Sequence, residues 1–237
     1  MYNVFESLRS LKILASRVLA HPSIGRTVGY LYGDVIPFRG MRIDVRGSSF
    51  PPANKAALWW GIYESAECRM IERYLLPDLP VIELGSSIGA VSSVIASRLR
   101  AGVRLSCVEG NPAVMSNLQR NLTNHARHLQ VSVLQAAIAY GTDRVGFEVA
   151  GDNLISKLAL DAARATVTVP CITLESLIDP FGQGPYQLVA DIEGAEAAIL
   201  TEDRKSLANC RTLIVEVHPT TERGVTLSCE DLVTMIC

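Results

Sequence analysis

The sequence lacks the features that identify several classes of protein. Its 237 residues contain no apolar run of 18, so we predict no transmembrane segment. The six cysteines form no C-x-x-C pair, which argues against a zinc site and fits reduced thiols in a cytoplasmic protein. The formal net charge is only -2, so we predict no nucleic-acid partner.

Two motifs of dinucleotide enzymes are also missing. The chain has neither a G-x-G-x-x-G turn nor a Tyr-x-x-x-Lys pair after its fourth predicted strand. Instead, the chain has an E-x-G-x-x-x-G pattern of Glu83, Gly85 and Gly89, which begins within the mostly apolar segment 81–84. Glycine lets the backbone approach a ligand, and the helix that follows offers free amides at its N-terminus. The pattern predicts a nucleotide-binding turn.

From residue 80 onward the predicted strands and helices alternate. This order is typical of an α/β fold with a doubly wound, mostly parallel sheet and a Rossmann-like topology. A hairpin-like pair of strands is predicted at 145–149 and 166–171. The alternating strands are expected at 81–84, 103–108, 131–139, 186–191 and 212–217, with helices at 90–99, 112–125, 173–178 and 195–203.

A helical N-terminal extension, residues 1–54, is predicted to precede the main domain, residues 55–237. Residues 1–20 predict an amphipathic helix that packs on the domain or forms a homodimer with a second copy. The rest of the extension is predicted to be irregular apart from a strand at 41–45, and 56–76 predicts one helix.

The C-terminal end is short for a sheet of this type. After the fifth predicted strand only residues 219–237 remain, with one helix expected at 231–236. We therefore expect the last two strands of the sheet to be missing.

Polar side chains follow four of the predicted strands. The carboxyl ends of parallel strands meet at one edge of a sheet, where ligands bind, so we expect these side chains to converge. They are Glu83, then Glu109 with Asn111, then Asp191 with Glu193 and Glu196, and finally Glu216 with His218.

Glu109 and Glu83 together distinguish two adenosine cofactors. An acid about twenty residues after the glycine turn accepts hydrogen bonds from an adenosine ribose, and Glu109 occupies that place. NAD and S-adenosylmethionine (SAM) share this ribose. A pyrophosphate would be repelled by Glu83, whereas the ammonium group of SAM would be attracted to it. We predict SAM, with an NAD(P)-dependent oxidoreductase as the alternative.

Seven segments between residues 60 and 220 resemble a known family. They are Tyr63-Glu64, V-I-E-L-G-S-S-I-G-A at 81–90, V-E-G-N-P at 108–112, A-A-I-A at 136–139, V-P-C-I-T-L-E-S-L at 169–177, D-I-E-G-A-E at 191–196 and L-I-V-E-V-H at 213–218. The chain is similar in these segments to the FkbM family of SAM-dependent methyltransferases, which have the class I fold. The last two segments are the most specific.

The resemblance implies a reaction and a cofactor site. Family members mostly methylate hydroxyl oxygens, so it implies O-methylation of a sugar, a glycan or another small natural-product acceptor. Tyr63 and Glu64 could fold over SAM or belong to the core, and both interpretations stay open. The other residues that the turn and the resemblance assign to the cofactor are Glu83, Gly85, Ser86, Gly89, Glu109, Asn111 and Ala137.

The resemblance places Asp191 and Glu193 between the sulfonium and the acceptor, with His218 on the acceptor side. Asp191 is the first candidate for the base that takes the hydroxyl proton, followed by Glu193, and His218 is the alternative. Each acid also has a structural explanation, because acids cap and stabilise helix N-termini. We predict no metal ligands, although Asp191, Glu216 and His218 would suit Mg²⁺ or Mn²⁺.

One departure from the family pattern motivates a third hypothesis. The family commonly has a lysine two residues before the acid of the D-I-E-G-A-E segment, and here that position is Val189. Together with the short C-terminal end, this makes a non-catalytic binding protein with the SAM fold a further alternative.

Overall fold

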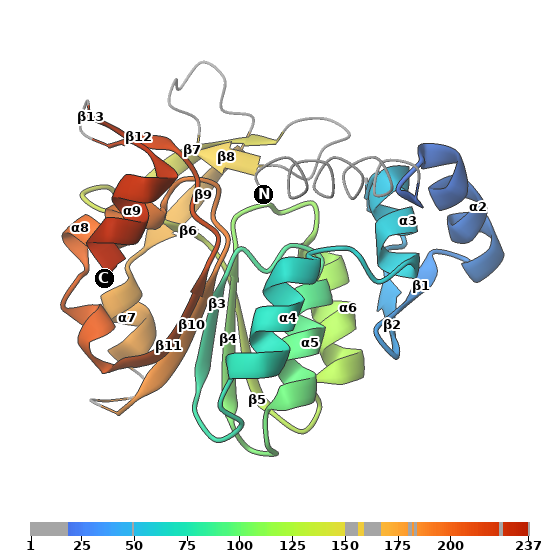
Figure 1. Ribbon diagram of the computed structural model, residues 1–237, viewed down its shortest axis with the longest axis horizontal. Helices are drawn as coiled ribbons and strands as arrows, with labels where there is room; N and C mark the ends of the chain where they lie inside the picture. Colours follow the sequence, from blue (N-terminus) through green and yellow to red (C-terminus); the bar gives the residue numbers. More distant parts are fainter. Residues whose placement is uncertain are drawn as a thin grey trace, which may run out of the picture.

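A parallel sheet of five strands forms the centre of the computed structural model (Figure 1). Residues 19–48, 50–149, 156–158, 167–179, 182, 184–222 and 225–236 are described. Across the sheet the strands follow the order β11-β10-β3-β4-β5, and every neighbouring pair is parallel. The five strands are β3 (Val81–Leu84), β4 (Arg104–Glu109), β5 (Gln130–Gln135), β10 (Tyr186–Ala190) and β11 (Cys210–Val215).

Helices cover both faces of this sheet (Figure 1). One face carries α4 (Ser65–Tyr74), α5 (Ala90–Arg98) and α6 (Met115–His125). On the other lie α7 (Leu174–Ile178), α8 (Glu196–Glu202) and α9 (Cys229–Ile236), with the short 3₁₀ helix η3 (Ser206–Asn209) before β11. The predicted α/β, doubly wound parallel fold is therefore confirmed.

The central strands are buried on both faces. Every residue of β3 and of β10 is buried, as expected for strands of a parallel sheet that is covered twice. Apolar side chains accordingly form one core cluster under α4, α5 and α6 and another under α7 and α8. Continuous apolar runs, rather than alternating ones, were the correct sequence signal for these strands.

The strand order reverses between β3 and β10. From β3 the chain proceeds through β4 to β5, and it then returns to β10 on the opposite side of β3. In a doubly wound sheet, a crevice forms at the carboxyl ends of the two strands where the order reverses. Gly85 follows β3 and Asp191 follows β10, so the two best-supported motifs meet at this point.

The prediction of one helix over 56–76 is wrong. The structure has α3 (Pro52–Trp59) and α4, separated by a turn in which Gly61 and Glu64 have φ values of 68° and 41°. The amides of Ile62 and Tyr63 both bond to the carbonyl of Ala57, which ends α3. The helical pattern on both sides of the turn was correct, but the left-handed residues reverse the chain direction between them.

The prediction for 21–54 was also incomplete. The predicted strand at 41–45 is observed as β2 (Met41–Asp44). The prediction missed the strand β1 (Val35–Phe38), which pairs with β2, and the helix α2 (Pro22–Tyr32), which precedes both. Two glycines lower the helix propensity of α2. Gly25 is needed there, because a Cβ atom would lie 1.5 Å from the carbonyl oxygen of Pro52.

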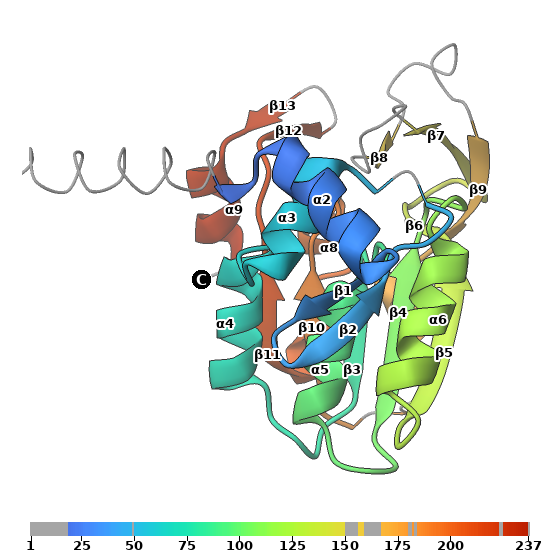
Figure 2. The same ribbon diagram turned by 90° about the vertical axis from the view of Figure 1, so that its right-hand side faces the viewer.

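A four-stranded sheet lies next to the central one (Figure 2). The predicted strand 131–139 divides into β5 and β6 (Ala137–Ile138), and β6 joins a sheet of order β6-β9-β7-β8. In that sheet β7 (Arg144–Val149) and β9 (Val167–Ile172) form the expected antiparallel pair, and β8 (Ser156–Leu158) adds to β7.

The C-terminal segment contains more than the predicted helix. A hairpin of β12 (Thr220–Glu222) and β13 (Val225–Leu227) precedes α9. In the described residues this hairpin does not extend the central sheet, which keeps five strands. The expected shortening of the sheet is thus observed, but the residues after β11 still form strands.

Several predictions concern parts of the chain that the structure does not test. The predicted amphipathic helix at 1–20 lies outside the described residues, except for its last two residues. The homodimer expected through this helix stays a prediction. The boundary at residue 54 falls within α3 and stays a prediction. Among the described helices, none combines the length and apolar character needed to cross a membrane.

Candidate functional site

The glycine turn and the Asp191 loop meet at the switch point. The amide of Gly85 donates to the carbonyl oxygen of Val108 at 2.9 Å, and the amide of Asp191 donates to the carbonyl oxygen of Leu84 at 3.0 Å. Gly85 has a φ of 87°, and a Cβ atom there would lie 1.9 Å from the carbonyl oxygen of Asp191. Glycine is therefore required at this position for the two loops to approach each other.

Glu83 lies beneath the turn. Its carboxylate is 2% exposed and accepts hydrogen bonds from the hydroxyls of Ser86 at 2.7 Å and Ser92 at 2.5 Å. Burial raises the pKa of Glu83, and the two serines partly offset this. Glu83 thus joins the turn to the first turn of α5, and it is not among the residues that line the recess described below.

Glu109 closes the turn from the end of β4. It is 8% exposed and accepts hydrogen bonds from the amides of Ser87 at 2.7 Å and Asn111 at 2.6 Å. Burial raises its pKa, while the bonds from these amides lower it. Asn111 in turn caps its own loop, because its side-chain oxygen accepts from the amide of Ala113. The carboxylate of Glu109 is therefore directed at the turn, and its contact with a ribose stays a prediction.

A recess of about 290 Å³, open to solvent, lies between the glycine turn, the Asp191 loop and α4. We call it the glycine-turn recess. Three of its lining residues are carboxylates, and none is a lysine or an arginine. The lining residues are Tyr63, Glu64, Glu67, Gly85, Ser86, Ser87, Ala90, Val91 and Asp191.

Tyr63 belongs both to the core and to the recess. Its ring contacts those of Phe38 and Phe50 edge-on, with centroids 6.4 and 5.6 Å away, while Tyr63 also lines the recess beside Ser87. The next residue, Glu64, has a left-handed φ of 41°, a strained conformation that often marks functional sites. The two interpretations of Tyr63 are thus compatible.

Sequence reasoning missed Glu67. It lines the recess from α4, and burial raises its pKa to about 9, with further contributions from Glu83 and Asp191. The signal was available in its spacing, because residues three positions apart share a helix face and Glu67 follows Glu64 by three. Without the break that starts α4 at Ser65, however, the direction of that face could not be inferred.

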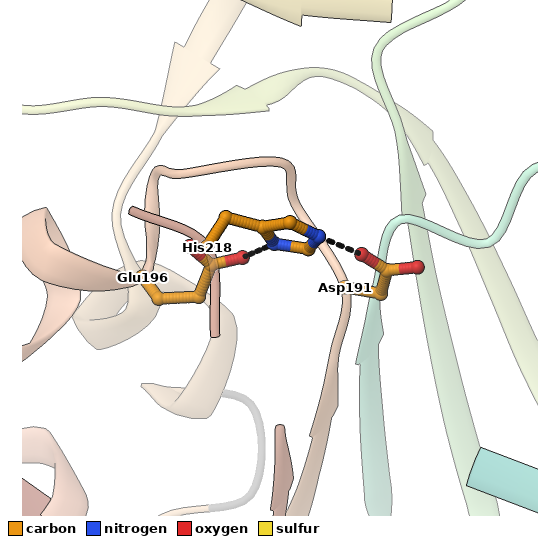
Figure 3. A group of neighbouring side chains, drawn as sticks. All are labelled: Asp191, Glu196 and His218. Atoms are coloured by element: carbon orange, nitrogen blue, oxygen red, sulfur yellow. Dashed lines mark hydrogen bonds and ion pairs between the residues drawn. The ribbon is translucent and has the colours of Figure 1, made fainter. Parts of the chain in front are cut away.

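On the other side of Asp191, four carboxylates surround one imidazole, and Figure 3 shows two of them, Asp191 and Glu196. We call this group the His218 cluster; it consists of Asp191, Glu193, Glu196, Glu216 and His218. The Nδ1 atom of His218 lies 3.2 Å from Oε1 of Glu196. Its Nε2 atom lies 3.9 Å from Asp191 Oδ1, 3.9 Å from Glu193 Oε2 and 4.0 Å from Glu216 Oε1.

The cluster concentrates negative charge. Burial, followed by the neighbouring carboxylates of Glu216 and Glu64, raises the pKa of Asp191 to about 7. Burial lowers the pKa of His218, but its hydrogen bond to Glu196 and the surrounding carboxylates outweigh that effect and raise it overall. The arrangement therefore favours positive charge at its centre.

Glu196 has two roles. It opens α8, as expected of an acid in a first helical turn, and its Oε1 accepts from the amide of Ile192 at 3.2 Å. The same residue is 2% exposed and holds the ring of His218. The structural explanation drawn from the sequence was correct but incomplete, because the contact with His218 spans 22 positions.

Besides Glu83 and Glu109, three predicted cofactor residues lie outside the recess lining. Gly89 starts α5 with a φ of 82°, and a Cβ atom there would lie 3.0 Å from Leu118. Asn111 shapes the loop after β4. Ala137 is 7% exposed and packs with Val169 between the smaller sheet and the core. The structure thus brings Tyr63, Glu64, Gly85, Ser86 and Asp191 together around the recess and gives these three residues other contacts.

Three solved structures match part of this chain. A provisionally assigned transferase from Pyrococcus horikoshii is 20% identical, with 41% of this chain and 34% of that one covered and a TM-score of 0.30. A precorrin-6y C5,15-methyltransferase from Geobacter metallireducens is 21% identical over 33% of this chain and 40% of that one, with a TM-score of 0.27. A geranyl diphosphate methyltransferase in complex with GPP and sinefungin is 12% identical over 50% and 46%, with a TM-score of 0.29.

In each pair less than half of the solved chain is covered. No curated protein matches this chain. The model of the methyltransferase FkbM domain matches residues 83–235, which is more than half of the chain and includes the glycine turn, Glu109 and the His218 cluster. The chain therefore belongs to the FkbM methyltransferase family.

Proposed function

We propose that this protein is a SAM-dependent methyltransferase that methylates a hydroxyl oxygen of a sugar, a glycan or another small acceptor. The observation that carries the proposal is the charge of the glycine-turn recess. Glu64, Glu67 and Asp191 line it, and its lining includes no lysine or arginine. A ligand with positive charge is stabilised there by Coulomb attraction, whereas a pyrophosphate is repelled.

The residues present fit SAM. When bound, SAM supplies a methyl group on a positively charged sulfur atom, and its amino-acid end carries an ammonium group. A positively charged ligand would lower the raised pKa values of Glu64, Glu67 and Asp191, so that their carboxylates ionise and compensate these charges. Glu109 would accept hydrogen bonds from the ribose, as acids at the end of the second strand do in related nucleotide folds. Glu83 would act indirectly, by holding Ser86 in place.

The His218 cluster would form the acceptor side. Asp191 borders both the recess and the cluster, so it would lie between the donor and the acceptor. Asp191, Glu193 and His218 would orient the acceptor hydroxyl and receive its proton, and orientation supplies much of the rate of a displacement reaction. Carboxylates and an imidazole suit a polar, hydroxylated acceptor, which agrees with the substrates that the family resemblance implies.

Calorimetry with SAM and with NAD⁺ tests the cofactor. We expect the wild type to bind SAM with a Kd in the micromolar range, and Glu109→Ala to weaken binding at least tenfold. The exposed Glu230 on α9 provides the control, because Glu230→Ala leaves the site intact. Binding of NAD⁺ instead of SAM would contradict the proposal and favour the oxidoreductase.

Methyl transfer to a panel of sugar acceptors then tests the reaction. Loss of a proton acceptor lowers rates by about 10²–10⁴-fold, so we expect the kcat of Asp191→Asn to be lower by that factor. The rates are compared at saturating SAM, because Asp191 also lines the recess. A wild type that binds SAM yet transfers no faster than Asp191→Asn would indicate a non-catalytic binding protein.

A further inference from the structure

We propose that the His218 cluster is a binding site for one divalent cation, Mn²⁺ or Mg²⁺. Its ligands would be Nε2 of His218 and carboxylate oxygens of Asp191, Glu193 and Glu216, and Glu196 would orient the imidazole. The site itself is independent of the cofactor, whereas its role in catalysis rests on the proposed function. The sequence alone led to the prediction of no metal ligands, and the geometry argues for the alternative.

The orientation of His218 is the first observation. Its Nδ1 atom lies 3.2 Å from Glu196 Oε1, so a proton on Nδ1 is donated to Glu196 and the lone pair is left on Nε2. A carboxylate in this position is the usual partner of a metal-binding histidine, because it fixes the tautomer and the direction of the ring. Figure 3 shows the ring held between Glu196 and Asp191 in this way.

The spacing of the oxygens around Nε2 is the second observation. Asp191, Glu193 and Glu216 each place an oxygen 3.9 to 4.0 Å from this nitrogen, which is too long for a hydrogen bond. Two ligands that are each about 2.1 Å from a shared ion lie at most about 4.2 Å apart. Each of the three oxygens, paired with Nε2, is therefore spaced so that both atoms could bind one small cation.

Unsatisfied buried oxygens are the third observation. Oδ1 of Asp191, the atom that faces Nε2, is buried without a hydrogen-bond partner, and so is Oε2 of Glu196. Glu196 is 2% exposed, so its carboxylate is sequestered from water within the cluster. Buried carboxylate oxygens without donors are strongly unfavourable. A cation held at Nε2 would compensate the charge of both residues.

The ligand atoms indicate which cation fits. Asp191, Glu196 and His218 offer ligand atoms within 4.8 Å of one another, and Glu64, Asp191 and Glu216 do the same. Oxygen-rich sites with a single imidazole and no thiolate suit Mg²⁺ and Mn²⁺ better than Zn²⁺. Such an ion would bind the acceptor hydroxyl and lower its pKa, which makes the oxygen a better nucleophile at neutral pH.

Electron paramagnetic resonance of Mn²⁺, added to the full chain after treatment with a chelator, tests the site without any cofactor. We expect one bound Mn²⁺ per chain. His218→Ala should weaken binding at least tenfold, and Glu196→Gln by about 10–100-fold, as for other residues that orient metal ligands. The partly exposed His125 on α6 is the control, and His125→Ala should bind Mn²⁺ like the wild type.

Two outcomes would overturn the site: no Mn²⁺ bound by the wild type, or equal affinity in His218→Ala. Glu216→Ala guards against misfolding of the histidine variant, because Glu216 is exposed and its loss should weaken Mn²⁺ binding without affecting the fold. Calorimetry with SAM on the same samples separates the two proposals. Mn²⁺ binding without SAM binding contradicts only the proposed function, and SAM binding without Mn²⁺ binding contradicts only the metal site.

Discussion

The two halves of the carboxyl edge treat their carboxylates differently. After β3 and β4, Glu83 and Glu109 receive hydrogen bonds from serine hydroxyls and backbone amides at 2.5 to 2.7 Å. After β10 and β11, Asp191 and Glu216 face His218 at 3.9 and 4.0 Å. The first half holds its carboxylates with hydrogen bonds from the protein and leaves one oxygen of Glu83 without a partner, whereas the second half gathers negative charge around an imidazole.

This difference separates two kinds of site. In the first half, hydrogen bonds fix the turn before any ligand arrives, which lowers the entropy lost on binding. In the second half the charges repel one another, so a cation or a hydrogen-bonding acceptor would stabilise the folded protein by binding. We infer that the first half is a preformed scaffold and that the second half depends on what it binds.

The largest expected effect is that of Gly85→Ala, which tests whether the scaffold is rigid. A left-handed φ disfavours alanine by about 1–2 kcal/mol, and the clash with the carbonyl of Asp191 adds about 1–3 kcal/mol. We expect a loss of about 3 kcal/mol or more in the free energy of unfolding, together with loss of SAM binding. Urea unfolding and calorimetry measure the two effects.

Gly102→Ala is the matched control for that variant. Gly102 has a similar φ of 84°, but a Cβ atom there would have no neighbour within 4 Å. Only the conformational penalty of about 1–2 kcal/mol should remain, with SAM binding unchanged. Equal losses in both variants would show that the approach of the two loops does not require glycine.

The next largest effect compares one carboxylate from each half. Glu83→Ala leaves the hydroxyls of Ser86 and Ser92 without their acceptor and opens a cavity, so we expect a loss of about 2–4 kcal/mol in unfolding free energy. Glu216→Ala removes repulsion from a half-exposed position. It should raise stability by no more than about 0.5 kcal/mol when a chelator removes divalent cations.

Urea unfolding of both variants in the presence of chelator measures this contrast. Similar losses in the two variants would show that the carboxylates of the second half are as well hydrogen-bonded as those of the first half. The contrast between the two halves would then be wrong.

The last effect concerns Glu67, whose pKa is raised by carboxylates of both halves. Its pKa of about 9 in the folded protein exceeds the ordinary 4.5 because of burial, followed by Glu83, Asp191, Glu64 and Glu216. The folded state therefore binds more protons than the unfolded state between these values, and stability falls as the pH rises from 4.5 to 9. One such group contributes at most about 1.4 kcal/mol per pH unit.

Unfolding in urea at pH 6, 7 and 8 measures this slope. In Glu67→Gln the decline should be shallower than in the wild type. Glu230→Gln, on the exposed face of α9, should keep the wild-type slope. An unchanged slope in Glu67→Gln would show that this carboxylate is hydrated rather than buried against α5.

The order of elements from residue 80 onward could be predicted because its signals are local. Buried strands such as β3 and β10 appear as short apolar runs, and a glycine or a proline ends most helices near them. The errors arose where a left-handed residue reverses the chain, as at Gly61, or where close packing needs glycine in a helix, as at Gly25. Neither constraint is visible without the neighbouring backbone.

The candidate site was predictable as a set of residues but not as an arrangement. Strand ends identified Glu83, Glu109, Asp191 and His218, because parallel topology brings such ends to one edge. The topology does not say which way a side chain points. Glu83 turns beneath the glycine turn, while Glu67, on a separate helix, enters the recess.

By itself, the sequence determined the succession of strands along the chain and the acids that meet at the carboxyl edge, because these follow from hydrophobic pattern and motif spacing. The resemblance of its motifs also indicated the family. Only the tertiary structure decided which of those acids are satisfied. Glu83 finds Ser92 nine positions away, and Glu196 finds His218 after 22. Partners so distant in the chain are brought together by tertiary packing. Packing therefore decides that Glu83 supports the glycine turn, whereas Asp191 is a candidate metal ligand.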